Sequence, residues 1–504
     1  MSDQNFQSFD VLIVGAGLSG IGTAVHLGKE CPDKSYAILE ARESLGGTWD
    51  LFRYPGIRSD SDMHTLGYSF KPWLKAKAIA DGPSILEYIN DAADEYDVRS
   101  HIRFSQKVIS ADWDSNSGRW IVVCDTGDGA ETRYACQYLA LCSGYYRYEE
   151  GYTPAFEGAS DFAGEIVHPQ HWPEDLDYAG KRVVVIGSGA TAVTLVPAMS
   201  DMAEHVVMLQ RSPTYIVSRP SEDKIGARLR SLLPTKMAYA VTRWKNVILQ
   251  RYFYNLARKR PEKVSERLVG MVKGALGENY DVETHFTPNY GPWDQRLCLI
   301  PDGDLWNAIN AGKASVVTDH IERFTSKGIM LKSGEEIPAD IIVTATGLDV
   351  QFFGGASLSV DGEEKPSGDL LNYKGLMYAG VPNLINVFGY VNASWTLKAD
   401  LAAQYLCRLI KAVDGKGAVA ATPTNTNADI ELMNSLDFSS GYVERARSKT
   451  PIQAKSAPWT ISQDYVSDRK TLGKAPVDDG FVKFTHMGQR VPKSVELNRS
   501  VTAS

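Results

Sequence analysis

The sequence lacks several features that would assign the chain to particular classes of protein. Its six cysteines show neither a C-x-x-C dithiol nor the paired spacing of metal ligands, so we expect no metal site and no chemistry based on a close cysteine pair. No run of about 18 apolar residues is present, and the polar, acidic N-terminus has no secretory pattern. These absences predict reduced, structural thiols in a cytoplasmic protein without an integral membrane segment.

The chain also lacks an excess of positive charge. A net charge of −8 offers no broad positive field, so we expect a small molecule rather than nucleic acid as the partner. The 504 residues exceed what one hydrophobic core holds, since cores stop growing near roughly 250–300 residues. Two or three domains are therefore expected, while the oligomeric state stays open.

Glycines in a strand–turn–helix pattern are present near the N-terminus. The run DVLIVGAGLSGIGTAVHL begins as an apolar strand, and Gly15, Gly17 and Gly20 then fit G-x-G-x-x-G. Such glycines let the backbone approach a dinucleotide pyrophosphate at the start of a helix. Glu40 ends the next apolar strand, 20 residues after Gly20, which is the spacing of an acid that binds a ribose hydroxyl. A solvated acid at a strand end is the alternative for Glu40.

A second copy of this pattern lies in the middle of the chain. The run KRVVVIGSGATAVTLVPAM contains Gly187, Gly189 and Ala192 in the fixed places, and the following strand ends in Gln210 and Arg211 instead of an acid. A guanidinium pairs with the 2′-phosphate of NADP, which an acid would repel. We therefore expect the second copy to bind NADPH and the first to bind FAD. An ordinary surface arginine is the alternative for Arg211.

Two dinucleotide folds in one chain predict an α/β protein with two Rossmann-like domains, the second inserted in the first. Glycines that close apolar strands, Gly144 and Gly347, are expected to mark the crossings, and the late strands at 340–347 and 384–392 to complete the first domain. The expected units are 1–145 (FAD-binding, first part), 146–345 (NADPH-binding, with a helical insertion at about 220–285), 346–470 (FAD-binding, completion) and 471–504 (C-terminal tail).

A third motif precedes the second glycine pattern. The run FAGEIVHPQHWP fits F-x-G-x-x-x-H-x-x-x-W-P at Phe162, Gly164, His168, Trp172 and Pro173. It resembles the fingerprint of type I Baeyer–Villiger monooxygenases, which are class B flavoprotein monooxygenases. The related flavin-containing monooxygenases and N-hydroxylases have similar strings, usually without the Trp-Pro ending. The resemblance implies an enzyme that uses FAD, NADPH and dioxygen to convert ketones into esters or lactones.

Other segments extend the resemblance over nearly the whole chain, except the helical stretch at about 220–285 and the tail beyond 470. The run GGTWDLFRYPGIRSD at 46–60 resembles the family's flavin-side segment, and SDMHTLGYSFKPW after it is most similar to the branch that includes the ethionamide-activating monooxygenases. WDQRLC matches the segment that holds the family's catalytic arginine, which transfers to Arg296. Many relatives have a lysine just before this arginine, where this chain has Gln295. The resemblance then implies that Arg211 contributes more of the preference for NADPH.

The glycine patterns and the resemblance together name the residues expected to bind the two cofactors. For FAD they are Gly15, Gly17, Gly20, Glu40, Gly47, Thr48, Trp49 and Asp60, and for NADPH they are Gly187, Gly189, Ala190, Thr191, Gln210, Arg211 and Ser212, with Thr346 and Gly347 at the late turn.

The implied reaction gives catalytic roles to Arg296 and Asp60. NADPH would reduce FAD, and reduced flavin would form a C4a-peroxide with dioxygen. A cation keeps this peroxide deprotonated and able to attack a carbonyl carbon, which is the role expected of Arg296, with Asp60 orienting the arginine. An interdomain salt bridge is the alternative for Arg296, and an N-cap is the alternative for Asp60.

Two further features have open interpretations. His168 is expected to make a structural or hinge hydrogen bond to backbone across a domain linker rather than to act as an acid or base. The stretch 224–279 has few glycines, mixes aromatic and cationic residues, and is predicted to be helical. A cover for the NADPH-binding domain is the leading interpretation, and a substrate-entry wall or a membrane-surface helix is the alternative.

Two other functions compete with ketone oxidation. A flavin N- or S-monooxygenase would use the protonated hydroperoxide and would not need a stabilising arginine, whereas a redox sensor would have no turnover. Arg296 and the Trp172-Pro173 pair favour the Baeyer–Villiger reaction, which sulfide oxidation can accompany in one protein. The sequence does not name the ketone or the regioselectivity.

Overall fold

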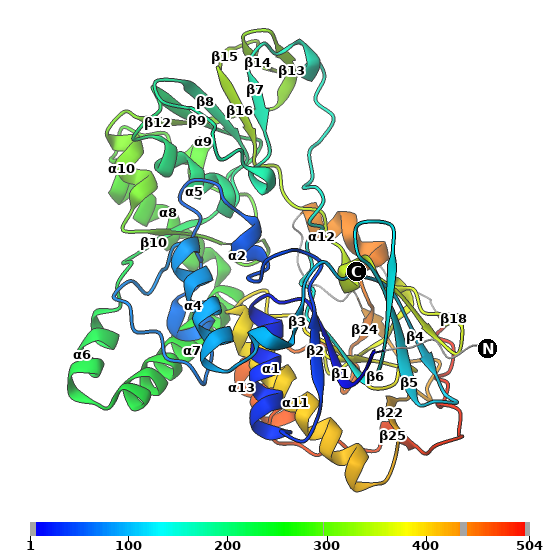
Figure 1. The fold of residues 1–504 in the computed structure, drawn as a ribbon. Coiled ribbons are helices and arrows are strands. Elements are labelled where there is room, and N and C mark those ends of the chain that lie inside the picture. The colour runs from blue at the N-terminus through cyan, green and yellow to red at the C-terminus, as the bar shows by residue number, and fades with distance from the viewer. Residues whose placement is uncertain (1–6, 296, 434–440, 499–504) are drawn as a thin grey trace.

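The computed structural model describes residues 7–295, 297–433 and 441–498, and two β-sheets from different parts of the chain dominate it (Figure 1). Their central strands are apolar runs, such as VLIV at the end of β1 and VVVI in β8, that are buried on both faces. This pattern is typical of parallel strands covered by helices. The predicted fold class, with one Rossmann-like domain inserted in another, is confirmed.

The first sheet has nine strands within the described residues, in the order β18-β17-β4-β5-β6-β1-β2-β3, with β21 beside β6. Strands β21, β6, β1, β2 and β3 run parallel, whereas β4 and β5 form an antiparallel extension. The strands of this sheet are β1 (Gln7–Val14), β2 (Tyr36–Leu39), β3 (Ile102–Arg103), β4 (Lys107–Asp114), β5 (Arg119–Asp125), β6 (Glu131–Leu141), β17 (Ser357–Val360), β18 (Glu363–Glu364) and β21 (Leu384–Asn386).

The second sheet is all parallel and, in the described part of the chain, has the order β12-β9-β8-β16-β7. Its strands are β7 (Glu165–Val167), β8 (Arg182–Ile186), β9 (His205–Gln210), β12 (Ala314–Thr318) and β16 (Ile341–Thr344). The expectation that the strand at 340–347 completes the first domain is wrong, because β16 pairs with β8 and β7. The later strand β21 does join the first sheet, through β6.

Small antiparallel ribbons complete the strand content. They are β13 (Ile321–Thr325) with β14 (Gly328–Leu331) and β15 (Glu336–Pro338), β19 (Asn372–Tyr373) with β20 (Met377–Tyr378), β22 (Ala420–Pro423) with β25 (Val482–Thr485), and β23 (Leu432–Met433) with β24 (Gln453–Ala454). A parallel pair, β10 (Ile216–Arg219) with β11 (Cys298–Pro301), brackets the helical insertion. Because β25 pairs with β22, the C-terminal stretch lies against the part of the chain that follows β21.

Helices surround both sheets. They are α1 (Leu18–Glu30), α2 (Thr48–Leu51), α3 (Met63–Leu66), α4 (Gly82–Glu95), α5 (Ala190–Met199), α6 (Lys224–Leu232), α7 (Thr235–Lys259), α8 (Pro261–Leu276), α9 (Val282–Phe286), α10 (Asp304–Asn310), α11 (Trp395–Gly415), α12 (Gly441–Ala446) and α13 (Tyr465–Thr471). Helices α1 and α11, far apart in the sequence, pack against each other beside the first sheet. None of the helices formed by the described residues combines the length and apolarity needed to cross a membrane.

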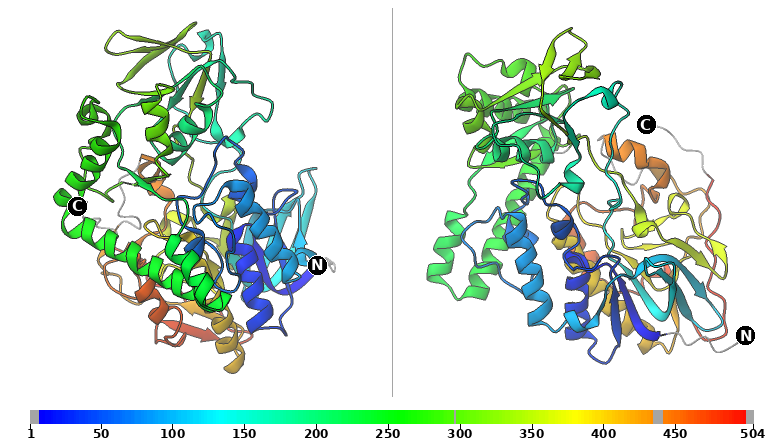
Figure 2. Two further views of the ribbon diagram at one scale, coloured as in Figure 1. Left: turned by 90° about the vertical axis from the view of Figure 1, so that its left-hand side faces the viewer. Right: turned by 45° about the horizontal axis from the view of Figure 1, so that its top comes forward.

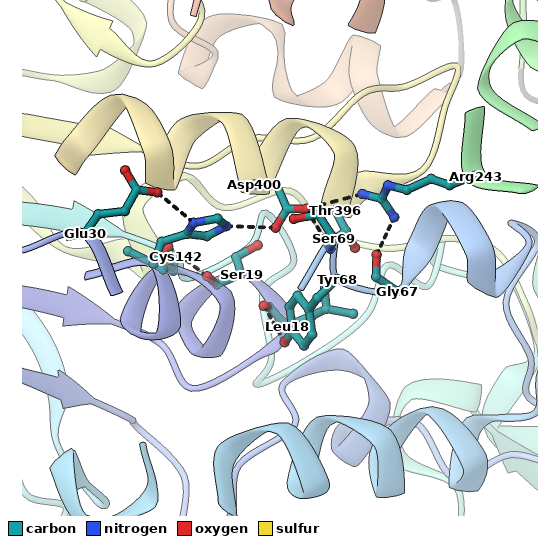
Figure 3. Close-up of polar contacts among 12 residues, drawn as sticks. Leu18, Ser19, Glu30, Gly67, Tyr68, Ser69, Cys142, Arg243, Thr396 and Asp400 are labelled. Carbon is teal, nitrogen blue, oxygen red and sulfur yellow. Dashed lines mark hydrogen bonds and ion pairs between the residues drawn. The ribbon is translucent and has the colours of Figure 1, made fainter. Parts of the chain in front are cut away.

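The long helix α7 of the insertion packs against the first domain. Its buried Arg243 donates hydrogen bonds to three carbonyl oxygens around α3, those of His64, Thr65 and Gly67. Arg243 also pairs with Asp400 of α11 at 3.2 Å (Figure 3). Helix α8, by contrast, packs against α9 and α10 of the second domain. The interpretation of the insertion as a cover for the second domain therefore misses the contacts of α7.

Candidate active site

A cavity of about 1330 Å³ is lined by residues from both domains. Both glycine turns reach it, as do the ends of β2 and β9 and the segment 46–61. Because parallel strands present their carboxyl ends at one edge of a sheet, two such edges facing one cavity can hold two dinucleotides end to end. The cavity is therefore the candidate site.

The first glycine turn is shaped for close backbone approach. Gly15 has φ +99°, and a Cβ on Gly20 would lie 1.9 Å from the carbonyl oxygen of Gly15. Gly17 is the N-cap of α1 and faces Gly47, whose α-carbon lies 3.5 Å from where a Cβ of Gly17 would be. Larger residues would fill this cradle at the positive end of the helix dipole, so the turn fits a pyrophosphate.

Glu40 lies at the end of β2 and is 5% exposed. Its Oε2 accepts a hydrogen bond from the Ala16 backbone N–H at 2.6 Å, and its Oε1 accepts one from Arg42 at 3.0 Å. Burial raises the pKa of the carboxyl, although these N–H groups oppose the shift. A solvated strand-end acid does not describe this residue. Its carboxyl is fixed against the glycine turn, beside the cavity.

The second glycine turn has the same design. Gly187 has φ +141°, and a Cβ there would lie 2.4 Å from the carbonyl oxygen of Ala345. Gly189 is the N-cap of α5, whose first turn contains Ala190 and Thr191. The residues of this turn line the cavity, namely Gly187, Gly189, Ala190 and Thr191. The turn therefore also fits an anionic group at a helix N-terminus.

The two residues at the end of β9 differ in environment. Gln210 is buried, and its Nε2 donates to the carbonyl oxygen of His285 at 2.7 Å and to Thr318 Oγ1 at 2.9 Å. Arg211 is exposed and lines the cavity, as does Ser212. A guanidinium at this place can bind an anionic group such as a phosphate, while the amide nitrogen of Gln210 is occupied by internal bonds.

The segment that follows β2 lies on the first domain's side of the cavity. Gly47 has φ +57° and precedes α2, where Thr48 and Trp49 line the cavity. Asp60 lines it as well. The side chain that caps the next helix is Asp62, which accepts a hydrogen bond from the Thr65 backbone N–H at 3.1 Å. Asp60 therefore is not the N-cap of α3.

The predicted catalytic arginine, Arg296, lies outside the described residues. Its neighbour Gln295 lines the cavity, and so does Cys298 two residues further on. The structure thus brings Asp60 and Gln295 to one cavity from segments more than 200 residues apart in the sequence.

The fingerprint segment contacts the boundary between the domains. Phe162 is buried in the core beneath β8 and β16, and a Cβ on Gly164 would lie 2.2 Å from the carbonyl oxygen of Asp340. Trp172 packs at the edge of the other core of the second domain, and Pro173 follows it. His168 Nε2 lies 3.3 Å from the carbonyl oxygen of Gly347, and burial lowers the pKa of its ring.

Gly347 and its neighbour Thr346 form the late turn, and both line the cavity. Gly347 has φ +112°, and its carbonyl oxygen also accepts a bond from the Tyr152 backbone N–H at 3.1 Å. Thr346 Oγ1 donates to the carbonyl oxygen of Tyr152 at 2.7 Å. His168 of the fingerprint and the backbone of Tyr152 therefore both contact the carbonyl oxygen of Gly347.

Aromatic residues that the sequence did not single out form a wall of the cavity. Tyr145 stacks on Trp395 with ring centres 5.3 Å apart, and Phe388 lies beside both rings. The indole N–H of Trp395 donates to Ser19 Oγ at 2.7 Å. Tyr145 follows β6, Phe388 follows β21, and Trp395 is the first residue of α11. In the sequence, the indication of this wall was Gly144, which precedes Tyr145 and was expected to mark a crossing between the domains.

No group of three or more potential metal ligands occurs among residues 7–295, 297–433 and 441–498. All six cysteines are buried and free of disulfides, in agreement with the expected structural thiols. Burial raises the pKa of the Cys142 thiol to about 12, so this cysteine near the first glycine turn stays protonated.

Comparison with known proteins identifies the family to which this chain belongs. The family model described as flavin-binding monooxygenase-like matches residues 78–414, and one described as an NAD(P)-binding Rossmann-like domain matches 13–78. The FAD-containing monooxygenase EthA of Mycobacterium tuberculosis is 52% identical over 95% of this chain and 98% of its own length. EthA of Mycolicibacterium smegmatis is also 52% identical, over 95% and 97%. The predicted resemblance is thereby confirmed.

Solved structures share the fold. The oxidized steroid monooxygenase bound to NADP has a TM-score of 0.74 at 24% identity, with 95% of this chain and 100% of that chain covered. Cyclohexanone monooxygenase from Rhodococcus sp. Phi1 bound to NADP+ has a TM-score of 0.75 at 20% identity, with 96% and 100% covered.

Proposed function

Since this chain belongs to the flavin-binding monooxygenase-like family, it is a flavin-dependent monooxygenase, and we propose that it carries out Baeyer–Villiger oxidation. In this reaction FAD, NADPH and dioxygen serve to convert a ketone into an ester or lactone. The observation that supports the proposal best is the single cavity that both glycine turns, Asp60 and Gln295 line. Two cofactors and a small substrate would meet there.

The first domain would hold FAD. The backbone of Gly15, Gly17 and Gly20 would bind the pyrophosphate at the N-terminus of α1, and Glu40 would bind the ribose. Gly47, Thr48, Trp49 and Asp60 would lie along the flavin. Bound flavin supplies the chemistry that the side chains lack, which is to accept a hydride and to activate dioxygen.

The second domain would hold NADPH. Gly187, Gly189, Ala190 and Thr191 would bind its pyrophosphate at the N-terminus of α5. Arg211 and Ser212 would bind the 2′-phosphate, for which an exposed guanidinium at the end of β9 is suited. Gln210 would act through the backbone, since its amide nitrogen bonds to His285 and Thr318. Thr346 and Gly347 would close the site.

The domain limits follow the same division. We assign 1–145 and 346–470 to the FAD-binding unit, 146–345 to the NADPH-binding unit and 471–504 to the tail. The pairing of β21 with β6 and of β16 with β8 supports this assignment. The contact of His168 with Gly347 lies where the chain crosses, which supports a hinge role for the fingerprint.

Arg296 would supply the positive charge of the reaction. A guanidinium beside the reacting oxygen favours its anionic form, which attacks a carbonyl carbon, and it then stabilises the oxyanion of the adduct. Asp60, on the cavity wall, would hold the guanidinium in place. A protonated oxidant would instead react with sulfur or nitrogen.

The test is the Arg296→Ala variant, with Arg323→Ala as control because Arg323 is exposed and does not line the cavity. Anaerobic reduction of the flavin by NADPH should be unchanged in both. Ester formation should fall by a factor of roughly 10² or more in Arg296→Ala only, which is the typical loss when a stabiliser of a developing oxyanion is removed. Ester produced at the parental rate would refute the role of Arg296.

A competition separates the two reaction types in the parental enzyme. Linear, cyclic and aromatic ketones and a sulfide are supplied together with NADPH in air, and the products are identified. Esters or lactones support the proposal. Sulfoxide without any ester would assign the chain to S-oxidation instead.

A further inference from the structure

The outer side of the helical insertion presents a face that is both apolar and basic. Helix α7 runs along the surface of the molecule next to α6, in front of the other elements when that side is viewed (Figure 2, left). Met237, Val241, Ile248 and Tyr252 of α7 are 44–58% exposed. Their spacings of four, seven and four residues place them on one side of the helix.

Further apolar side chains widen this face. Leu249 and Phe253 of α7 lie beside the first row and are 44% and 49% exposed, and Ile225 and Leu232 of α6 are 59% and 71% exposed. Large apolar side chains exposed singly are ordinary, but a group of this size on neighbouring helices marks a surface that another apolar body covers.

The opposite side of α7 is already occupied. Its Arg243 and Thr242 are buried, and Tyr239 donates to the carbonyl oxygen of Tyr68 at 3.0 Å. The exposed apolar row is therefore not the side with which α7 packs against the first domain. The helix has a buried side toward the first domain and a bare apolar side.

The charge around this face is opposite to that of the whole chain. Residues 224–260 contain ten lysines and arginines and no acidic residue, whereas the chain has a net charge of −8. Four of the ten pair with carboxylates of other segments, namely Arg243, Lys245, Arg251 and Arg258. Lys224, Arg228, Lys236, Lys259 and Arg260 are exposed, and within the described residues none of them pairs with a carboxylate. Lys259 follows Tyr252 by seven residues, so it lies on the apolar side.

We propose that this face of α6 and α7 binds the surface of an anionic phospholipid bilayer. An apolar row flanked by lysine and arginine fits the acyl boundary and the headgroups together, with the helices lying in the plane of the interface. A second copy of the chain would bring two strongly cationic segments together, which like-charge repulsion opposes. Nucleic acid would not cover the apolar row.

The test uses the full-length holoenzyme in co-sedimentation with vesicles of equal parts phosphatidylglycerol and phosphatidylcholine, and with vesicles of phosphatidylcholine alone. The parental protein should sediment with the anionic vesicles and bind them at least tenfold more tightly than the neutral ones. Added salt should weaken this binding, because it screens the charges.

Two variants address the two parts of the face. I248E/Y252E should lower binding at least tenfold, while M202E/M487E, which adds equal charge at methionines exposed elsewhere, should change it less than twofold. R228E/K259E should lower it more than twentyfold, since each lysine or arginine near an anionic surface contributes about a fivefold effect. K332E/K474E, at exposed lysines elsewhere, is its control.

Any of three results would overturn the proposal. The first is a parental protein that stays in the supernatant with anionic vesicles, and the second is an I248E/Y252E variant that sediments as the parent does. The third is a parental dimer in sedimentation velocity that I248E/Y252E converts to monomer without any vesicle binding, which would assign the face to self-association. NADPH consumption without vesicles should be equal in all variants, which verifies that each is folded.

Discussion

A buried chain of charges between α1, α11 and α7 makes the stability of the protein depend on pH in a specific way. His26 of α1 is 6% exposed, and its ring nitrogens lie 3.2 Å from Glu30 and 3.3 Å from Asp400. Asp400 also pairs with Arg243 (Figure 3). Burial alone would lower the pKa of His26, but the hydrogen bonds and charges of the two carboxylates reverse the effect and raise it to about 9.

The sign of the effect follows from this shift. The ring binds its proton more tightly in the folded protein than in the unfolded chain, where the pKa is about 6.5. The contribution to the free energy of unfolding is therefore complete below pH 6.5 and is lost as the pH rises through 9. At about 1.4 kcal/mol per pKa unit, it amounts to roughly 3 kcal/mol.

The perturbation is His26→Gln, which keeps a polar side chain but cannot titrate. Thermal unfolding of the parental holoenzyme and of the variant is measured from pH 6 to pH 9.5. The parent should exceed the variant in Tm by on the order of 5 °C at pH 6, and the difference should shrink to near zero at pH 9.5. Titratable groups that both proteins contain affect the two Tm values equally, so their effects cancel in this difference. A difference that does not change between pH 6 and pH 9.5 would refute the reasoning.

Two further predictions concern the cofactor sites. Arg211→Ala should raise the KM for NADPH by roughly 10- to 100-fold, the loss expected for charge-assisted hydrogen bonds of about 1.5–3 kcal/mol, and should leave the KM for NADH unchanged; equal effects on both would exclude Arg211 from a phosphate site. Gly20→Ala should yield protein without the visible flavin absorbance, because its Cβ would lie 1.9 Å from the Gly15 carbonyl oxygen. Gly28→Ala, on the same helix with open space around it, is the control and should retain flavin. Flavin bound normally by Gly20→Ala would contradict the cradle geometry.

The local parts of the site could be predicted from the sequence because short-range chemistry determines them. The turn at Gly15 requires φ +99°, and the place of Gly20 leaves no room for a side chain, so the glycine pattern and the backbone geometry coincide. The same holds for Gly187. Glu40 followed from the fixed length of the strand–helix–strand unit.

Contacts between distant segments could not be predicted in this way. The apolar run of β16, the strand before Gly347, would suit a central strand of either sheet. Its pairing with β8 is what assigns it to the second sheet. Ser-Asp-Ser-Asp offers two caps to α3, and the structure uses Asp62 rather than Asp60. The approach of Arg243 to Asp400 spans 157 residues and has no local signal.

The most direct test of the proposed function follows the oxygen atom. The parental enzyme is supplied with a ketone, NADPH and ¹⁸O-labelled dioxygen, and the product is examined by mass spectrometry. The proposal predicts an ester or lactone with one labelled oxygen, formed in equal amount to the NADPH and dioxygen consumed. NADPH consumption that yields only hydrogen peroxide, or a labelled sulfoxide as the sole product when a sulfide is present, would contradict it.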